Sequence, residues 1–137
     1  MSGVRILPDT HIALWAIANS PRLPDAARKI LLSYDNEIYY SAASVWELTI
    51  KHSLHPEHLP FSGREFSAFC RAAGYNPLPI TDEHIYALES LRYPEEAPKH
   101  KDPFDRLLIS QAKAEDMLFL THDSLIPNYN EPFIIKV

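Results

Sequence analysis

The hydrophobic positions of this chain fall into two patterns that alternate from one end to the other. Short runs rich in aromatic and β-branched residues are typical of buried strands, whereas apolar residues three and four positions apart are typical of amphipathic helices. The first pattern predicts strands over residues 4–7, 37–41, 75–80, 117–120 and 133–137. The second predicts helices over residues 11–18, 25–33, 42–51, 62–74, 81–91 and 102–115. This order predicts an α/β layer fold with a mostly parallel central sheet of about five strands, flanked by helices.

The composition is that of an ordinary globular protein with a single domain over residues 1–137. Hydrophobic residues make up 46% and charged residues 23% of the chain, which argues against disorder. The one cysteine, Cys70, can form no internal disulfide, and its place on an apolar helix face predicts a buried, unreactive thiol. No run approaches the length of a membrane span and no signal peptide is evident, so we expect a cytoplasmic protein without membrane contact.

The formal net charge of −5 argues against a simple polyanion-binding protein, which would be basic. That argument loses force if several acids surround bound cations, because the charge of the ions then counts in the local sum. The densest basic group is formed by Lys99, His100 and Lys101. Such a group is usually a solvated loop, but beside an acidic site it would meet a phosphate backbone.

Residues 101–109, Lys-Asp-Pro-Phe-Asp-Arg-Leu-Leu-Ile, read as the beginning of a helix that presents a carboxylate. Asp102 suits the N-cap, Pro103 suits the first helical position, and Asp105 falls in the first turn. A capping box formed by Asp102 and Asp105 is the structural alternative to a functional role for either acid.

Three further acids occupy comparable positions. Asp9 and Asp123 follow predicted strands, and Glu47 lies in the first turns of the helix at 42–51. Each has a structural alternative: Asp9 as an N-cap, Asp123 as the cap of a short turn, and Glu47 as the partner of Ser44 in a capping box.

In a parallel α/β fold, the carboxyl ends of strands and the N-termini of helices share one edge of the sheet. We therefore expect Asp9, Glu47, Asp105 and Asp123 to face the same rim. Four carboxylates so close together would repel one another unless cations held them. A site of carboxylates without cysteine suits Mg²⁺ or Mn²⁺, which can clamp a phosphate oxygen and activate a water for attack.

Four segments resemble the successive motifs of the PIN-domain nucleases, most closely the VapC-like toxins of bacterial toxin–antitoxin pairs. In chain order they are Leu-Pro-Asp-Thr-His at 7–11, Ser-Ala-Ala-Ser-Val-Trp-Glu at 41–47, Asp-Pro-Phe-Asp-Arg-Leu-Leu-Ile at 102–109 and Leu-Thr-His-Asp at 120–123. The resemblance spans essentially the whole chain and implies a three-layer fold. The third motif is the most specific of the four.

By position, the resemblance implies that Asp9, Glu47 and Asp105 hold Mg²⁺ or Mn²⁺ and that Asp123 completes the site directly or through water. Asp102 matches the flanking cap of the motif and is not expected to bind the metal directly. It implies a ribonuclease that acts on a structured RNA such as a transfer RNA and leaves a 5′-phosphate and a 3′-hydroxyl. It also implies a homodimer whose site is blocked by a small antitoxin. Arg106 and residues 99–101 are the predicted contacts to the RNA backbone.

One position departs from the family pattern, because Pro8 stands where an aliphatic residue of the central strand is usual. Proline removes a backbone donor, so the strand should end early or bend just before Asp9. A catalytically impaired module that acts through protein or RNA binding is therefore the main alternative. A phosphate-accepting receiver-like domain, suggested by Asp9 and Asp35 beside strands, fits poorly because Thr10 and His11 follow Asp9.

Other residues with chemical potential have simpler interpretations. Trp15 and Trp46 are predicted to be core or subunit-interface residues rather than ligand contacts. Spacing also places Phe66 and Phe69 on the inward face of the helix at 62–74. Zinc binding by the histidines near residue 55 is weighed against a solvated loop, since Pro56 interrupts their helix and no cysteine joins them. These histidines are His52, His55 and His58.

Overall fold

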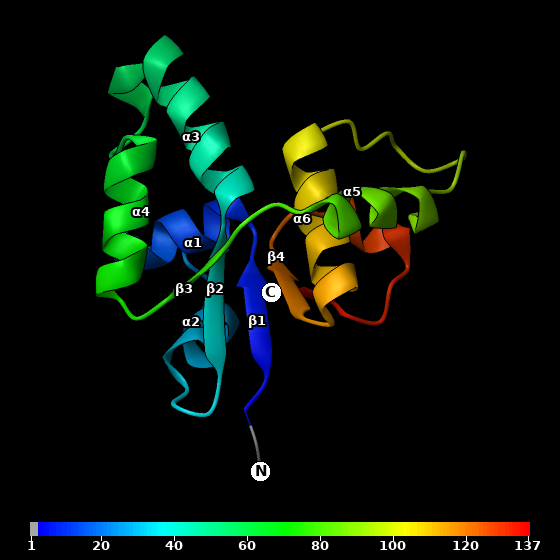
Figure 1. Cartoon of the computed structure of the whole chain (residues 1–137), viewed down its shortest axis with the longest axis horizontal. Helices are drawn as coiled ribbons and strands as arrows, with labels where there is room; N and C mark the ends of the chain where they lie inside the picture. The colour runs from blue at the N-terminus through cyan, green and yellow to red at the C-terminus, as the bar shows by residue number, and fades with distance from the viewer. Residues whose placement is uncertain (1–2) are drawn as a thin grey trace.

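The computed structural model describes residues 3–137 and contains one sheet of five parallel strands in the order β3-β2-β1-β4-β5. The strands are β1 (Arg5–Pro8), β2 (Glu37–Ser41), β3 (Asn76–Leu78), β4 (Leu118–Thr121) and β5 (Ile134–Lys136). The helices are α1 (Thr10–Ile17), α2 (Asp25–Leu32), α3 (Ala42–Leu54), α4 (Gly63–Ala72), α5 (Asp82–Ala87) and α6 (Pro103–Glu115). Short 3₁₀ segments are η1 (Pro56–His58), η2 (Leu88–Ser90) and η3 (Ile126–Tyr129). The predicted strands and helices are all present (Figure 1), which confirms the α/β fold.

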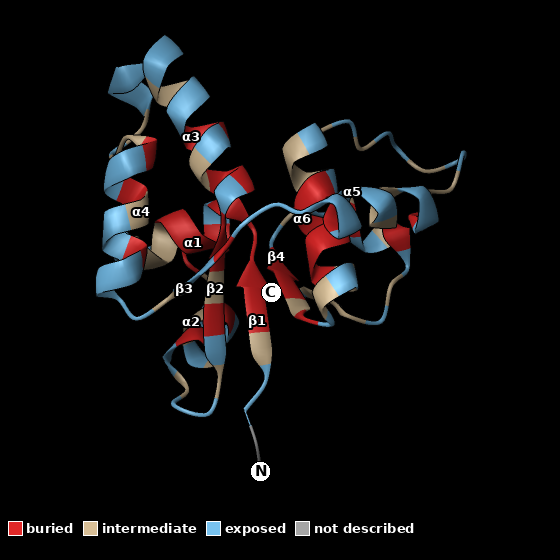
Figure 2. Cartoon of the chain, in the orientation of Figure 1, coloured by how far each residue is buried: buried red, intermediate tan, exposed pale blue. Residues whose placement is uncertain are grey.

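Strand alternation divides the core into two layers on opposite faces of the sheet. On one face Ile6 and Leu120 pack with residues of α1 and α2, including Ile12 and Leu31. On the other face their neighbours Leu7 and Phe119 pack against α6. Buried residues accordingly run along β1, β4 and α6 in Figure 2. Helices on both sides of a parallel sheet form the expected three-layer architecture.

Helices α3 and α4 form a third cluster beside the sheet. Leu48 of α3 packs with Phe66 and Cys70 of α4, all of them buried. Burial raises the pKa of the Cys70 thiol to about 12, in agreement with the prediction of an unreactive side chain. Phe69 was wrongly predicted to face inward: it is 45% exposed and packs on Phe61 instead, with the two ring centroids 4.8 Å apart. The reason is that the inward stripe of α4 follows the four-residue step from Phe66 to Cys70.

The two tryptophans do not share an environment. Trp15 is partly buried and packs against the cluster on the α1 side of the sheet. Trp46 of α3 is 54% exposed, and its ring packs edge-on against Phe104 of α6 at 4.8 Å. A core position for Trp46 is therefore wrong for the isolated chain, and its role at a subunit interface stays a prediction.

Pro8 is accommodated without displacing the chain that follows it. Strand β1 ends at Pro8, just before Asp9, yet the backbone N–H of Asp9 still donates to Leu120 O of β4 at 2.8 Å. Because successive N–H groups of a strand point to opposite sides, the donor that Pro8 lacks would face β2. The pairing of β1 with β2 extends to Ile6 and Ile38 and ends before Pro8, where this donor is missing.

The carboxyl ends of β1 and β4 and the N-termini of α1, α3 and α6 meet at one edge of the sheet (Figure 1). This edge carries the four predicted acids. Within residues 3–137, none of the helices has the length and apolar character needed to cross a lipid bilayer.

Candidate active site

Asp9 caps α1 and is almost completely buried, at 4% exposure. Its Oδ1 accepts the backbone N–H of Ile12 at 2.8 Å, and its Oδ2 accepts the hydroxyl of Thr121 at 2.7 Å. Burial raises the pKa of Asp9, although both hydrogen bonds act in the opposite direction. The capping role is therefore real, and the carboxylate also lines the cleft described below.

Glu47 is the most deeply buried of the charged side chains at this edge, with 2% exposure. The N-cap of α3 is Ser41, while the hydroxyl of Ser44 bonds that of Thr10 at 2.8 Å, so the capping box of Ser44 and Glu47 is not formed. Glu47 Oε2 pairs with the ammonium of Lys51 at 2.5 Å. Its Oε1 is buried and has no hydrogen-bond partner among residues 3–137.

Asp105 lies in the first turn of α6, where Asp102 is the N-cap. Asp102 Oδ1 accepts the backbone N–H groups of Phe104 at 2.8 Å and Asp105 at 3.1 Å, so the carboxyl of Asp105 is not needed for capping. The pKa of Asp105 is raised to about 8, first by burial and then by the negative charges of its acidic neighbours. In decreasing order of effect these neighbours are Asp102, Asp9, Glu47 and Asp123.

Asp123 follows β4 and caps the turn that leads to η3. Its Oδ1 accepts the N–H of Leu125 at 2.7 Å, and its own N–H donates to Thr121 Oγ1 at 3.0 Å. Asp123 also belongs to a compact group with Asp105 and His100, in which the possible metal-ligating atoms all lie within 4.8 Å of one another. Asp123, like Asp9, therefore caps a turn or helix and also lies beside the other acids of the site.

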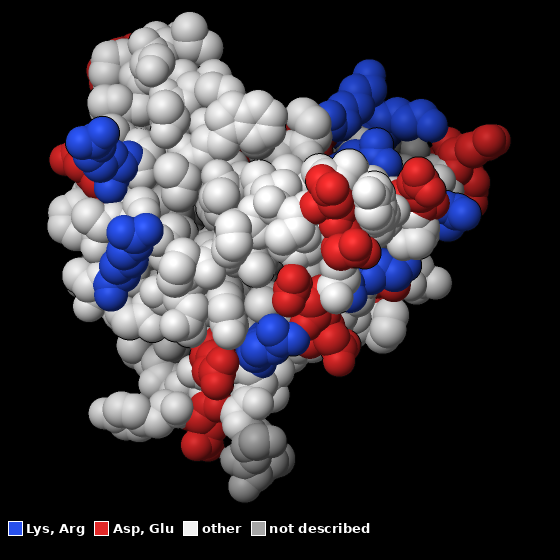
Figure 3. Space-filling view, in the orientation of Figure 1, with Lys and Arg blue, Asp and Glu red and all other residues white. Residues whose placement is uncertain are grey.

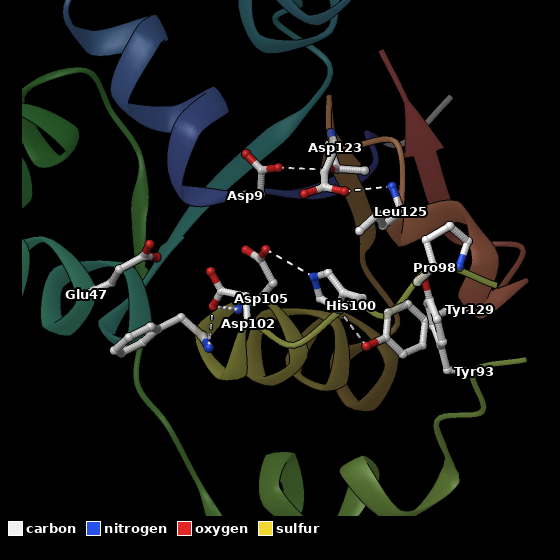
Figure 4. A network of polar contacts seen from close by, with 12 residues as sticks. Asp9, Glu47, Tyr93, Pro98, His100, Asp102, Asp105, Asp123, Leu125 and Tyr129 are labelled. Carbon is white, nitrogen blue, oxygen red and sulfur yellow. Dashed lines mark hydrogen bonds and ion pairs between the residues drawn. The ribbon is translucent and has the colours of Figure 1, made fainter. Parts of the chain in front are cut away.

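Three of these acids, Asp9, Asp105 and Asp123, border one open cleft at the edge of the sheet. Figure 4 shows the carboxylates of Asp9, Asp105 and Asp123 around a common space, with Glu47 to one side of them. Glu47 does not line the cleft itself, but its charge reaches Asp105. The cleft is lined by Asp9, His11, Trp15, His100, Lys101, Asp102, Asp105, His122, Asp123 and Leu125.

Basic residues gather at one border of the cleft. Figure 3 shows lysine and arginine side chains over the segment that leads into α6, where Lys99, Lys101 and Arg106 are exposed. Of these, Lys101 lines the cleft. The basic group therefore lies beside the acids, as a contact to a phosphate backbone would require.

Three residues of the site were missed by sequence reasoning: His100, Thr121 and Lys51. His100 was grouped with its basic neighbours, yet its side chain is 3% exposed, with Nδ1 2.8 Å from Tyr129 Oη and Nε2 3.3 Å from Asp105 Oδ2. Burial lowers the pKa of His100, although Asp123 and Asp102 act in the opposite direction. The spacing of Glu47 and Lys51, four residues apart on a helix, was the one available sign of their ion pair.

The donor set of the site suits a divalent ion. An unpaired buried carboxylate oxygen on Glu47 and the strongly raised pKa of Asp105 both indicate negative charge that lacks a counter-ion. Carboxylate oxygens are the ligands that Mg²⁺ and Mn²⁺ prefer.

The histidines near residue 55 lie elsewhere. His55, Glu57 and His58 form an exposed group at the carboxyl end of α3, and His52 is not part of that group. Their exposure agrees with the solvated loop that the sequence favours, and nothing in the structure tests zinc binding there.

Comparison with known families and structures gives a consistent picture. The family model of the PIN domain matches residues 6–131, a span that includes all four predicted acids. The fold is similar to a chain of VapBC2 from Rickettsia felis, solved bound to a DNA fragment of its promoter, with a TM-score of 0.66 and 19% identity over 98% of each chain. It is also similar to a toxin–antitoxin complex from Klebsiella pneumoniae, with a TM-score of 0.61 and 16% identity over 96% of each chain.

A further similar structure is FitAcB from Neisseria gonorrhoeae, with a TM-score of 0.55 and 21% identity over 88% of each chain. At these identities the likeness to the solved structures concerns the fold. Comparison with curated protein sequences gives no match.

Proposed function

We infer that this chain, which belongs to the PIN domain family, is a metal-dependent endoribonuclease that hydrolyses RNA at the carboxylates of Asp9, Glu47, Asp105 and Asp123. The observation that carries the proposal is the environment of Asp105. Its pKa is raised to about 8 by burial and by four surrounding acids, at the mouth of an open cleft. When ionised, these acids repel one another, and a bound cation would offset that repulsion; strongly perturbed pKa values of this kind are typical of functional sites.

Mg²⁺ or Mn²⁺ would be held by Asp9, Glu47 and Asp105, with Asp123 as a direct or water-mediated fourth partner. When bound, such an ion supplies Lewis acidity, which lowers the pKa of a water and stabilises charge on a phosphate. The helix N-termini of α1 and α6 at this edge add partial positive charge.

The surrounding residues hold the acids in place and receive the substrate. Thr121 and the N–H of Ile12 fix the carboxylate of Asp9. The carboxylate of Asp102 accepts the backbone N–H of Phe104 and so caps α6. Lys101, at the border of the cleft, would contact the phosphate backbone on either side of the scissile bond.

The proposal extends to the biological role. Toxin–antitoxin complexes are among the solved structures with this fold, which supports a toxin whose cleft is blocked by a cognate antitoxin. We further propose a cytoplasmic homodimer that cuts a structured RNA such as a transfer RNA. The exposed indole of Trp46 beside Phe104 is suited to a subunit contact.

The test is cleavage of a labelled pool of structured RNAs by the purified, antitoxin-free protein with Mn²⁺ or Mg²⁺. We expect cuts that disappear with a chelator and in Asp105→Asn. The matched control is Asp116→Asn, the same change at the C-cap of the same helix, where the left-handed φ of 57° suits asparagine. A folded protein that binds metal but does not cut RNA would contradict the nuclease and favour a binding module of the same fold.

A further inference from the structure

The imidazole of His100 lies at the carboxylates, and the proposed function leaves it without a role. It comes from the loop before α6 and is 3% exposed. Its Nε2 is 3.3 Å from Asp105 Oδ2, and His100, Asp105 and Asp123 form the group whose ligating atoms lie within 4.8 Å of one another. Figure 4 shows the ring between Asp105 and Tyr129. A nitrogen donor is therefore present where the sequence predicted oxygen donors alone.

The two ring nitrogens make contacts of different length. Nδ1 is 2.8 Å from Tyr129 Oη, an ordinary hydrogen bond, whereas Nε2 is 3.3 Å from the carboxylate. A charge-assisted hydrogen bond from a nitrogen to a carboxylate is shorter, at about 2.7–2.9 Å. Two atoms that bind neighbouring positions of an octahedral ion lie about 3 Å apart. The contact between Nε2 and Oδ2 is a long hydrogen bond, and its length is also close to the separation of two ligands of one ion.

Tyr129 provides the support that a ligating histidine needs. Histidines that bind metals almost always donate their other ring N–H to an oxygen, which fixes the tautomer and the direction of the ring. If Nδ1–H donates to Tyr129 Oη, the lone pair of Nε2 points toward Asp105 and Asp123. A cation between Nε2 and the carboxylates would then satisfy all three groups. The buried, unpaired Oε1 of Glu47 is a separate sign of a missing cation at this edge.

We propose that His100 is a nitrogen ligand of the divalent ion, which adds an imidazole beside Asp105 and Asp123 to the carboxylates of the site. This inference rests on the proposed function, because it assumes that the acids bind an ion. Imidazole is a ligand of transition-metal ions, whereas Mg²⁺ takes oxygen ligands. Mn²⁺ should therefore bind the chain more tightly than Mg²⁺ does.

The test loads the full chain with Mn²⁺ alone and uses pulsed electron paramagnetic resonance, which detects nitrogen bonded to Mn²⁺. We expect a nitrogen coupling in the wild type that is lost in His100→Ala and in His100→Gln, a variant of similar length without a ring nitrogen. Mn²⁺ affinity should fall by about tenfold or more in His100→Ala. Mg²⁺ affinity should fall less, so the ratio of the two affinities decreases.

The matched controls are His11→Ala and His122→Ala, because both histidines line the same cleft. Each should keep the nitrogen coupling, and circular dichroism without metal checks that every variant folds. Mn²⁺ bound without nitrogen coupling, or with coupling that depends on His11 or His122, would overturn the assignment. So would unchanged Mn²⁺ affinity in both His100 variants. These results leave the nuclease proposal standing, because RNA cleavage is measured separately, whereas a folded wild type that binds no Mn²⁺ refutes both.

Discussion

The hydroxyl of Thr121 donates a hydrogen bond to Oδ2 of Asp9 at a distance of 2.7 Å. The same hydroxyl oxygen accepts the backbone N–H of Asp123 at 3.0 Å. One fully buried side chain at the end of β4 therefore connects the acid that follows β1 with the acid that follows β4. Since the N–H of Ile12 holds the other oxygen of Asp9, this carboxylate is fixed from two sides.

We predict that Thr121→Val lowers both stability and RNA cleavage. Valine keeps the shape of threonine but removes the hydroxyl, so a buried carboxylate oxygen loses its partner, at a cost of about 1–3 kcal/mol in the free energy of unfolding. Cleavage should fall by about tenfold or more, as for other residues that orient a metal ligand. Denaturant unfolding and initial rates with saturating Mn²⁺ measure the two effects.

Thr121→Ser is the matched control for this prediction, because serine keeps the hydroxyl. It should recover most of the cleavage rate. Equal rates for the valine and serine variants would show that the hydrogen bond to Asp9 does not matter for catalysis.

The stability of the metal-free protein should fall as the pH rises from about 4 to about 8. In the folded chain Asp105 keeps its proton up to pH about 8, whereas in the unfolded chain it loses it near its ordinary value of 3.8. Between these values the folded state binds more protons, so the free energy of unfolding decreases with pH. Denaturant unfolding with a chelator at several pH values measures the decrease, which should be smaller in Asp105→Asn. An identical pH dependence in this variant and in the wild type would contradict the raised pKa.

Much of this site could be predicted from the sequence because its positions are tied to local signals. Asp9 and Asp123 follow short buried runs, and Asp105 follows the Asp-Pro signature of a helix N-terminus. In a parallel sheet these signals place the acids on one edge, whichever side chains fill the core. The sequence could not exclude that Asp9 and Asp123 act as caps, and in the structure each of them does cap the segment that follows it.

What the sequence could not provide depends on contacts between distant segments. His100 reaches the acids because its loop packs against Tyr129, which lies 29 residues further along the chain. Trp46 has the character of a core residue, yet it is 54% exposed, with its ring edge-on against Phe104. Neither relationship leaves a periodic signal in the chain.

Divalent ions should raise the melting temperature of the wild type, because they neutralise the acids only in the folded state. An ion present at 100 times its dissociation constant adds about 2.7 kcal/mol to the free energy of unfolding. We expect a clear rise with millimolar Mn²⁺ in the wild type and in Asp116→Asn, and little or none in Asp105→Asn. Thermal melts followed by circular dichroism provide the measurement. An unchanged wild-type melting curve would argue against a preformed metal site.

Removal of Lys99 and Lys101 should weaken RNA binding more than the chemical step. Both are exposed and Lys101 lines the cleft, so the double alanine variant should raise KM and change kcat less. The dependence of binding on salt should also decrease, by up to about two in the logarithmic slope, because two phosphate contacts are lost. Lys29→Ala, an exposed lysine on α2, is the control and should keep the wild-type slope. A lower kcat with unchanged KM would contradict a role in binding.

Substitution of Lys51 provides a test of whether Glu47 belongs to the metal site. Its ammonium pairs with Glu47 Oε2 at 2.5 Å. Although burial lowers the pKa of Lys51, Glu47 and then the more distant Asp102 and Asp105 raise it, so this ion pair lies within electrostatic reach of the other acids. In the absence of metal, the ammonium is the only cation that the structure places on Glu47 within residues 3–137.

We predict that Lys51→Met lowers the free energy of unfolding of the metal-free protein by about 1–3 kcal/mol, because it leaves a buried carboxylate without a partner. Mn²⁺ should then stabilise the variant more than the wild type, since the ion takes over the lost positive charge. The double variant Glu47→Gln with Lys51→Met removes both charges of this pair, so it should gain the least from the ion and show the smallest Mn²⁺ shift. Melting curves with and without Mn²⁺ compare the three proteins. If Lys51→Met shows the same Mn²⁺ shift as the wild type, Glu47 lies beyond the reach of the ion, and the metal depends on the acids of the cleft alone.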